Sequence, residues 1–140
     1  MGDLLDQARE ALNAQPFTRL VGATLEKMDG ESVVLILPLR DDLKQQHGFA
    51  HGGVLSYLAD NALAIAGSGG LGRPVLTSEF KINFVRPAVG TALVARANVI
   101  HAGKRQAVCR CDVFARDVGI EKLVATAQGT ITKVDDLPHR

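Results

Sequence analysis

Residues 54–66 restrict the fold of this chain more than any other segment, because they contain neither glycine nor proline. At 100° per residue, as in an α-helix, eight of their apolar side chains fall within an arc of about 180°. These side chains are Val54, Leu55, Leu58, Ala59, Ala62, Leu63, Ile65 and Ala66. A stripe of that width predicts one buried helix. The glycines that follow predict where it ends: Gly67, Gly69, Gly70 and Gly72.

Most of the remaining chain carries strand patterns. Apolar runs or apolar–polar alternation occupy six segments: residues 20–28, 32–39, 78–84, 92–101, 106–116 and 122–133. Turn sequences join three pairs of them: Asp29-Gly30, residues 102–105 and residues 117–119. Helices and strands do not alternate here as they do in parallel sheets, so we expect an antiparallel sheet that covers the long helix. The predicted fold class is α+β.

The two ends of the chain have patterns of their own. Apolar side chains recur at helical spacing between residues 3 and 13, which predicts a short amphipathic helix ended by Pro16. Residues 135–140 carry several charges and a proline, and are expected to be frayed. With 140 residues, 46% of them hydrophobic and 22% charged, the chain suits a single domain over residues 1–140.

The balance of charge excludes some classes of function. Sixteen Lys and Arg residues and fifteen Asp and Glu residues give a net charge of +1, without the basic excess typical of nucleic-acid-binding proteins. No apolar run reaches the length of a membrane span, and the N-terminus lacks the basic start of a signal peptide. We therefore expect a cytoplasmic protein with no nucleic-acid and no membrane partner.

Neither the cysteines nor the histidines form a metal-binding pattern. Cys109 and Cys111 share a face if they lie on one strand, and their parallel side chains do not favour a mutual disulfide. We expect them to be small core residues in a reducing compartment. His47 and His51 are four residues apart, but the surrounding glycines oppose the helix on which such a pair would bind metal. No metal site is predicted.

A polar, glycine-rich segment, residues 45–53, stands immediately before the predicted buried helix. Its last residues, His51-Gly52-Gly53, place backbone N–H groups at a helix N-terminus, where they have no helical acceptor. Together with the helix dipole, such groups can stabilise a developing oxyanion, and glycine lets a substrate carbonyl come close. The alternative interpretation is that the glycines only shape a turn.

Asp60 lies on the helix face opposite the apolar stripe. Its neighbours on that second face are Ser56, Tyr57 and Ala64, which are neither charged nor strongly apolar as a group. A lone carboxylate in that setting suggests a partly covered cleft. Periodicity alone also fits an ordinary solvated helix face, so both interpretations stay open at this point.

Residues 45–53 and Asp60 resemble the hotdog-fold acyl-CoA thioesterases of the phenylacetate-degradation, PaaI-like type. That family carries Asn/Gln-x-x-Gly-x-x-His-Gly-Gly followed by a helical Asp or Glu. Here the segment reads Gln-Gln-His-Gly-Phe-Ala-His-Gly-Gly ahead of Asp60. Residues 77–88, 101–105 and 127–130 also resemble family segments, and the similarity spans residues 17–134.

The resemblance implies a hotdog fold, with an antiparallel sheet wrapped around one long central helix, and a mechanism without a cofactor. Asp60 would attack the thioester carbon or activate water, and the Gly52 N–H would polarise the carbonyl. Gln45, in place of the more common Asn, would orient the carbonyl or the water. Thr77 would bring a hydroxyl near the carboxylate, and His51 would brace the loop.

The resemblance also implies an assembly, because sites of this family form between two subunits. The loop with Gln45 and Gly52 would come from one subunit and Asp60 from the other, so we expect a homodimer, and further a homotetramer built as a dimer of dimers. The helix face with Ser56, Tyr57, Asp60 and Ala64 would then be covered by the partner.

Further residues are assigned to substrate binding on the same basis. Gly53 and Ser56 stand beside Gly52 and Asp60 in the same segment. Coenzyme A carries a pyrophosphate and a 3′-phosphate, for which the basic candidates are Arg86, Lys104 and Arg105. The expected reaction is hydrolysis of an aryl- or short- to medium-chain acyl-CoA to the free acid and CoA.

Two other functions fit a hotdog fold. A hydratase or dehydratase uses a catalytic His near a His-Phe-Pro-Gly segment, whereas residues 47–53 contain no proline. A non-catalytic acyl-CoA-binding protein should lack the helical carboxylate or carry an added DNA-binding region, whereas Asp60 is present and the length leaves no room for a second domain. Thioester hydrolysis is therefore the favoured prediction.

Overall fold

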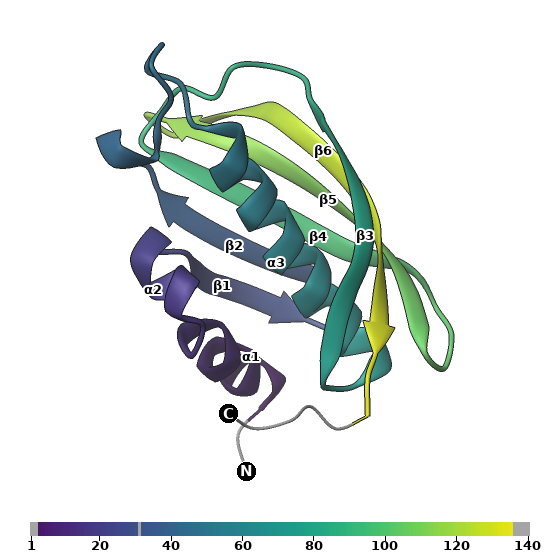
Figure 1. Cartoon of the computed structure of the whole chain (residues 1–140). Helices are drawn as coiled ribbons and strands as arrows, with labels where there is room; N and C mark the ends of the chain where they lie inside the picture. The colour runs from purple at the N-terminus through teal and green to yellow at the C-terminus, as the bar shows by residue number, and fades with distance from the viewer. Residues whose placement is uncertain (1–2, 31, 136–140) are drawn as a thin grey trace.

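The computed structural model describes residues 3–30 and 32–135 of the chain (Figure 1). Its helices are α1 (Leu4–Asn13), α2 (Pro16–Val21) and α3 (Gly52–Leu71), with a short 3₁₀ turn at Asp41–Leu43. Its strands are β1 (Thr24–Asp29), β2 (Ser32–Pro38), β3 (Val75–Phe84), β4 (Ala92–Ala102), β5 (Gln106–Asp117) and β6 (Ile120–Lys133). No helix in this described part of the chain is long and apolar enough to cross a membrane.

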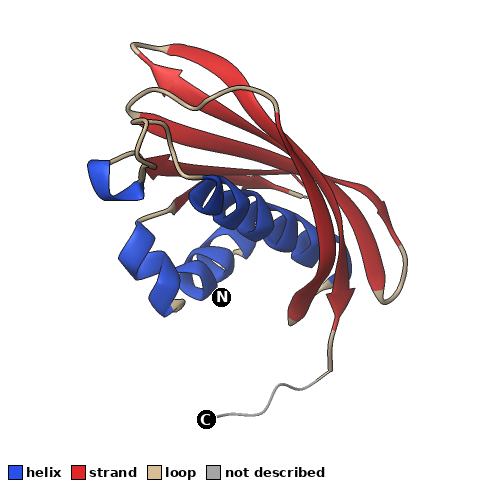
Figure 2. Ribbon diagram, turned by 45° about the horizontal axis from the view of Figure 1, so that its top comes forward, coloured by secondary structure: helices blue, strands red, loops and turns tan. Residues whose placement is uncertain are grey.

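The strands of the described residues form one sheet in the order β1-β2-β4-β5-β6-β3, and all neighbours are antiparallel. The sheet curves around α3, while α1 and α2 lie beside β1 (Figures 1 and 2). Contacts between α1 and β1 protect that edge of the sheet. The predicted α+β fold, an antiparallel sheet around one long helix with a short N-terminal helix, is confirmed.

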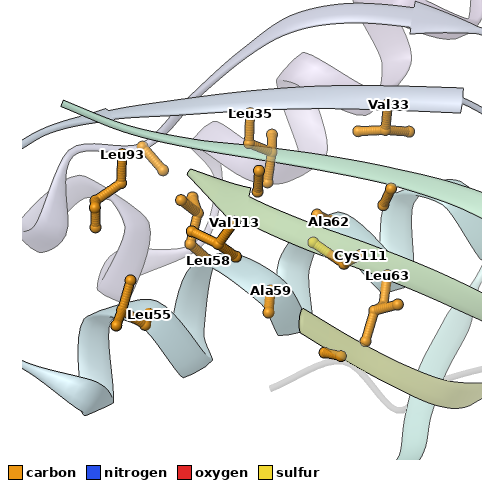
Figure 3. Close-up of a cluster of buried hydrophobic side chains, with 14 of the residues drawn as sticks. Val33, Leu35, Leu55, Leu58, Ala59, Ala62, Leu63, Leu93, Cys111 and Val113 are labelled. Atoms are coloured by element: carbon orange, nitrogen blue, oxygen red, sulfur yellow. The ribbon is translucent and has the colours of Figure 1, made fainter. Parts of the chain in front are cut away.

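The apolar stripe of α3 supplies the centre of the core. Leu58, Ala59 and Leu63 are completely buried. They pack against side chains from the concave face of the sheet, among them Leu35, Leu93, Cys111 and Val113 (Figure 3). Burial of one leucine side chain stabilises the folded state by about 1.5–3 kcal/mol. This packing fixes how α3 is rotated, and therefore where its non-core residues lie.

The helix does not end at the first glycine, as the sequence predicted, but continues to Leu71. A Cβ atom added to Gly67 would lie 2.7 Å from Ile131, and one added to Gly69 would lie 2.6 Å from the carbonyl oxygen of Gly30. These glycines therefore allow close packing of α3 on β6 and on the β1–β2 turn. Gly72, at a φ of 81°, is the residue that caps the helix.

The N-terminal region also differs in part from the prediction. Asp3 caps α1 by accepting a 2.8 Å hydrogen bond from the backbone N–H of Asp6, as expected of an N-cap. Pro16, however, begins α2 instead of only ending α1, because proline is well accommodated at the first helical position. Residues 20 and 21 are consequently helical, and β1 begins at Thr24.

The two cysteines are core residues, as the sequence predicted. Cys109 and Cys111 form no disulfide and are completely buried among the strands. Burial raises the pKa of the Cys111 thiol to about 12, so it stays protonated at neutral pH.

The C-terminal tail, residues 135–140, was expected to be frayed. Asp135 is exposed, and its Oδ1 atom lies 3.5 Å from Nη2 of Arg105. Residues 136–140 lie outside the described residues.

Candidate active site

The loop before α3 is held in place by its own backbone. The N–H of Gln45 donates to the carbonyl oxygen of Phe49 at 2.8 Å, and that of Gly48 donates back to Gln45 at 3.0 Å. Gly48 has a φ of 85°, a conformation that favours glycine. The N–H of Ala50 donates to Ala88, which ties the loop to the segment after β3. Gln45 is thus presented by a fixed turn.

The N-terminus of α3 leaves one backbone donor open. His51 is the N-cap residue, and its Nδ1 accepts the N–H of Gly53 at 2.8 Å. The N–H groups of Val54 and Leu55 both donate to the carbonyl oxygen of His51. Among the described residues, no acceptor faces the N–H of Gly52. His51 therefore lies where a loop brace would lie, and Gly52 is the free donor of this helix end.

Gln45 and Gly52 line one cavity of about 390 Å³ together with Arg86. A side chain not predicted for the site, Phe84, also lines it. A Cβ atom added to Gly52 would lie 3.4 Å from Cζ of that ring. The Oε1 atom of Gln45 accepts a hydrogen bond from the backbone N–H of His47, so its amide NH₂ group is left to meet a ligand. The cavity therefore offers N–H donors and a cation.

Asp60 and Thr77 form a second group. The hydroxyl of Thr77 donates a hydrogen bond to Oδ1 of Asp60 at 2.7 Å, and both side chains are half-buried. Eight residues separate Gly52 from Asp60 along α3, a rise of about 12 Å. Neither Asp60 nor Thr77 lines the cavity of Gln45 and Gly52. One chain therefore holds an oriented carboxylate and a set of N–H donors in two separate places.

The second face of α3 is partly covered by the chain itself, which corrects the expectation that a partner covers all of it. Tyr57 packs edge-on against Phe17, with ring centroids 5.3 Å apart, and its hydroxyl lies 2.6 Å from that of Thr18. Burial raises the pKa of Tyr57, and the hydrogen bond with Thr18 opposes this shift. Ala64 lines a small cavity under α1. Ser56 is half-buried on the same side as Asp60.

The three predicted basic residues do not lie together in one chain. Arg86 lines the cavity described above and an adjoining one of about 430 Å³, which also contains Lys122. Lys104 and Arg105 belong to the β4–β5 turn, at the opposite end of the sheet from the start of α3 (Figure 1). Arg105 is also paired with Asp135. Lys122 was missed because a lysine in a strand carries no distinguishing sequence signal.

Phe84 was missed for a different reason. In residues 78–84, Phe80, Ile82 and Phe84 alternate with polar residues, a pattern typical of a strand with one buried face. The side chain of Phe84 is nevertheless 53% exposed and lies over Gly52. Its position at the end of the strand, two residues before Arg86-Pro87, is the signal that could have indicated this. Within residues 3–30 and 32–135, no group of three or more His, Cys, Asp or Glu side chains could hold a metal ion.

Several known proteins similar to this chain are thioesterases. A model of the thioesterase superfamily matches residues 47–122, the region from the Gly52 loop to the start of β6. The acyl-coenzyme A thioesterase PaaI of Escherichia coli K12 is 30% identical over 79% of this chain and 77% of its own. The solved structure of E. coli PaaI has a TM-score of 0.80 and 26% identity, covering 95% of this chain and 97% of that one.

A thioesterase family protein from Silicibacter pomeroyi is more similar still in structure. Its TM-score is 0.88 at 32% identity, over 93% of this chain and 97% of that one. The range matched by the thioesterase superfamily, residues 47–122, contains the N-terminus of α3, Asp60 and Thr77. The resemblance to the PaaI type seen in the sequence is thus confirmed: the chain belongs to the thioesterase superfamily and has its hotdog fold.

Proposed function

We propose that this protein hydrolyses acyl-CoA thioesters to the free acid and CoA. The observation that carries the proposal is the combination of one open helix N-terminal donor, on Gly52, with a carboxylate oriented by a hydroxyl, on Asp60. The first can bind the oxyanion of a thioester under attack, and the second can supply the nucleophile or general base. The acyl-CoA thioesterase PaaI, 30% identical, supports the same substrate class.

The separation of about 12 Å between these groups requires a second copy of the chain. Strand β3 is an edge of the sheet, and Leu76 and Phe84 on it are more than half exposed. In the proposed dimer, two β3 strands pair about a two-fold axis, with Thr77 of one copy opposite Phe84 of the other. The ring of that Phe84 lies next to Gly52 of its own copy. The pairing therefore places this Gly52 near Asp60 of the first copy. The active protein is then a homodimer, and we extend this to a dimer of dimers.

The same pairing of two β3 strands would bring basic residues of the two copies close together. Lys133 pairs with Val75, and the backbone N–H of Lys133 donates to the carbonyl oxygen of Arg105. The β4–β5 turn therefore lies at the Val75 end of β3. A two-fold axis between the two β3 strands therefore places the Val75 end of the second copy near Arg86 of the first copy. Lys104 and Arg105 of one copy and Arg86 and Lys122 of the other then flank the path of the CoA phosphates.

The reaction follows from these placements. The thioester carbonyl oxygen accepts from the Gly52 N–H and from the amide of Gln45, which makes its carbon electrophilic. The Asp60 carboxylate, held by Thr77, either attacks this carbon or takes a proton from the attacking water. A C–O bond forms, the C–S bond breaks, and CoA leaves as the thiolate. With the Asp60 route, water then cleaves the acyl-enzyme anhydride.

A thiol-release assay tests the proposal. Purified protein is incubated with acetyl-, hexanoyl-, phenylacetyl- and benzoyl-CoA and a thiol-reactive dye, and release of CoA is expected with at least one of them. A hydratase would instead change enoyl- or hydroxyacyl-CoA without freeing the thiol. A non-catalytic binding protein would bind acyl-CoA with no release. Either outcome would refute the proposed reaction.

We also assign this activity to the cytoplasm. Cys109 and Cys111 are buried and form no disulfide, which suits a reducing compartment. Fractionation of cells that express the tagged protein, followed by immunoblotting, would test the assignment. Recovery in a membrane or secreted fraction would contradict it.

A further inference from the structure

A cavity of about 260 Å³ lies between α1, α3 and the beginning of β3. The α1 wall is small or aliphatic and consists of Ala8, Ala11 and Leu12. The α3 wall combines Ala64 and Ile65 with the short polar side chains of Asn61 and Ser68, and Gln15 and Arg73 also line the cavity. A cavity of this kind can accept an apolar group of limited size.

The cavity is lined by close neighbours of the Asp60–Thr77 pair. Along α3, Ala64 follows Asp60 by one turn and lies on the same side of the helix. Along β3, Val75 lines the cavity and precedes Thr77 by two residues, so the two side chains lie on the same face of the strand. Both elements therefore lead from the carboxylate into the cavity.

We propose that this cavity receives the acyl group of the substrate and that α1 limits the length of that group. The inference rests on the proposed thioesterase function, because it takes Asp60 as the group that meets the thioester carbon. A cavity of about 150 Å³ is sufficient for benzene. A volume of about 260 Å³ therefore suits one ring with a short linker, or a short chain, and we expect long acyl chains to be poor substrates.

The α1 wall is held firmly enough to act as a limit. Nε of Arg9 donates to the carbonyl oxygen of Leu25 at 3.0 Å, which fastens α1 to β1. Nη1 of Arg73 donates to the carbonyl oxygen of Gln7, also at 3.0 Å. Directly after α1, the Gln15 amide donates to Oδ1 of Asn61 on α3 at 3.0 Å. Ala11 and Ala64, which both line the cavity, thus belong to walls that are tied together.

The test compares two substrates within each variant. Ala11→Leu fills the cavity from α1, and Ala64→Val fills it from α3. In each, the ratio of kcat/KM for phenylacetyl-CoA to kcat/KM for acetyl-CoA is expected to fall about tenfold or more, since extra bulk in a pocket discriminates on this scale. The ratio is independent of the fraction of protein that is folded. Ala14→Leu, at the exposed end of α1, is the matched control and should keep the wild-type ratio.

The outcomes separate this inference from the proposed function. If the wild type hydrolyses acyl-CoA but both filled variants keep its ratio, the acyl group lies elsewhere and the inference is wrong while the function stands. Efficient hydrolysis of palmitoyl-CoA by the wild type would likewise overturn the length limit. If the wild type releases CoA from no acyl-CoA, the proposed function fails and the inference fails with it.

Discussion

The hydroxyl of Thr77 on β3 donates a 2.7 Å hydrogen bond to the carboxylate of Asp60 in the middle of α3. This bond crosses from the edge strand of the sheet to the central helix, and it fixes one oxygen of the carboxylate. A hydrogen bond to a charged acceptor is stronger than one between neutral groups. The orientation of the second carboxylate oxygen is therefore also fixed, as a nucleophile or general base requires.

Thr77→Val removes the hydroxyl and keeps the shape of the side chain. We expect kcat to fall about tenfold with little change in KM, because the carboxylate loses its orientation but not its charge. Thr77→Ser restores the hydroxyl and should recover most of the loss. Steady-state kinetics on the best acyl-CoA substrate provide the measurement. Wild-type kcat in Thr77→Val would show that the bond has no part in catalysis.

Asp60→Asn keeps the size of the side chain and removes its charge. The expected loss in kcat is about 10²-fold or more, the scale of general-base catalysis. Folding should be preserved, since Asp60 is only half-buried and the amide can still accept from Thr77. The thermal midpoint, measured by circular dichroism, checks this. Near-native turnover would refute the role of the carboxylate.

Gly52 and Gly53 should respond in opposite ways to substitution. At Gly52, a new side chain meets only the partly exposed ring of Phe84, so Gly52→Val should lower kcat about 10²- to 10³-fold, with little change in thermal stability. A Cβ atom at Gly53 would lie 2.9 Å from Nδ1 of His51, so Gly53→Ala should disturb the cap and cost about 0.5–2 kcal/mol of stability.

Kinetics and thermal melts of the two glycine variants distinguish the roles. If Gly52→Val unfolds the protein, this glycine serves the turn, although its φ lies outside the left-handed region. If Gly52→Val keeps full activity, its N–H is not the oxyanion donor. The donor would then have to be sought in the amide of Gln45, because the N–H of Gly53 is already bonded to His51.

The pH dependence of stability should reflect Glu121, on the face of the sheet away from α3. Hydrogen bonds from Arg96 and then Arg116 lower its pKa from 4.5 to about 2. A lowered pKa in the folded state stabilises the protein above pH 4.5, and this contribution is lost as the pH falls from 4.5 to 2. Glu121→Gln should thus cost about 1–2 kcal/mol at pH 7.

Urea denaturation of wild type and Glu121→Gln at pH 7 and at pH 2.5 measures this difference. The difference between the two proteins should be largest at pH 7 and should shrink to roughly a quarter of that value at pH 2.5, just above the folded-state pKa of about 2. A difference that is the same at both pH values would contradict a role for the charge of Glu121. Asp29→Asn offers a control, because its ion pair with Lys27 is largely exposed and should contribute little.

The sequence predicted the fold well wherever a pattern reflects local burial. The stripe of α3 and the alternation of β5 are periodic because one side of each faces the core. The end of α3 was predicted wrongly because Gly67 and Gly69 do not end the helix. They allow its close approach to Ile131 and Gly30, which are distant in sequence. Pro16 is equally compatible with ending one helix and beginning another, and the sequence does not distinguish these.

The site was predictable only in parts. Periodicity placed Asp60 off the core, and the position of Gly52 before the helix identified a donor, but nothing local relates either residue to Thr77. That contact depends on where β3 lies beside α3, which the resemblance to a family suggested and the folded chain shows. Which N–H group of the helix end is free depends on the side chain of His51, a detail that spacing cannot reveal.

The central claim is that Asp60 of one copy works with Gly52 of another, and complementation tests it most directly. Asp60→Asn and Gly52→Val chains carrying different tags are co-expressed, and the heterodimer is isolated. One of its two sites then combines an intact Asp60 with an intact Gly52. We predict recovery of about half the wild-type kcat per dimer, while each variant alone stays inactive. A folded heterodimer as inactive as its parents would contradict the shared site.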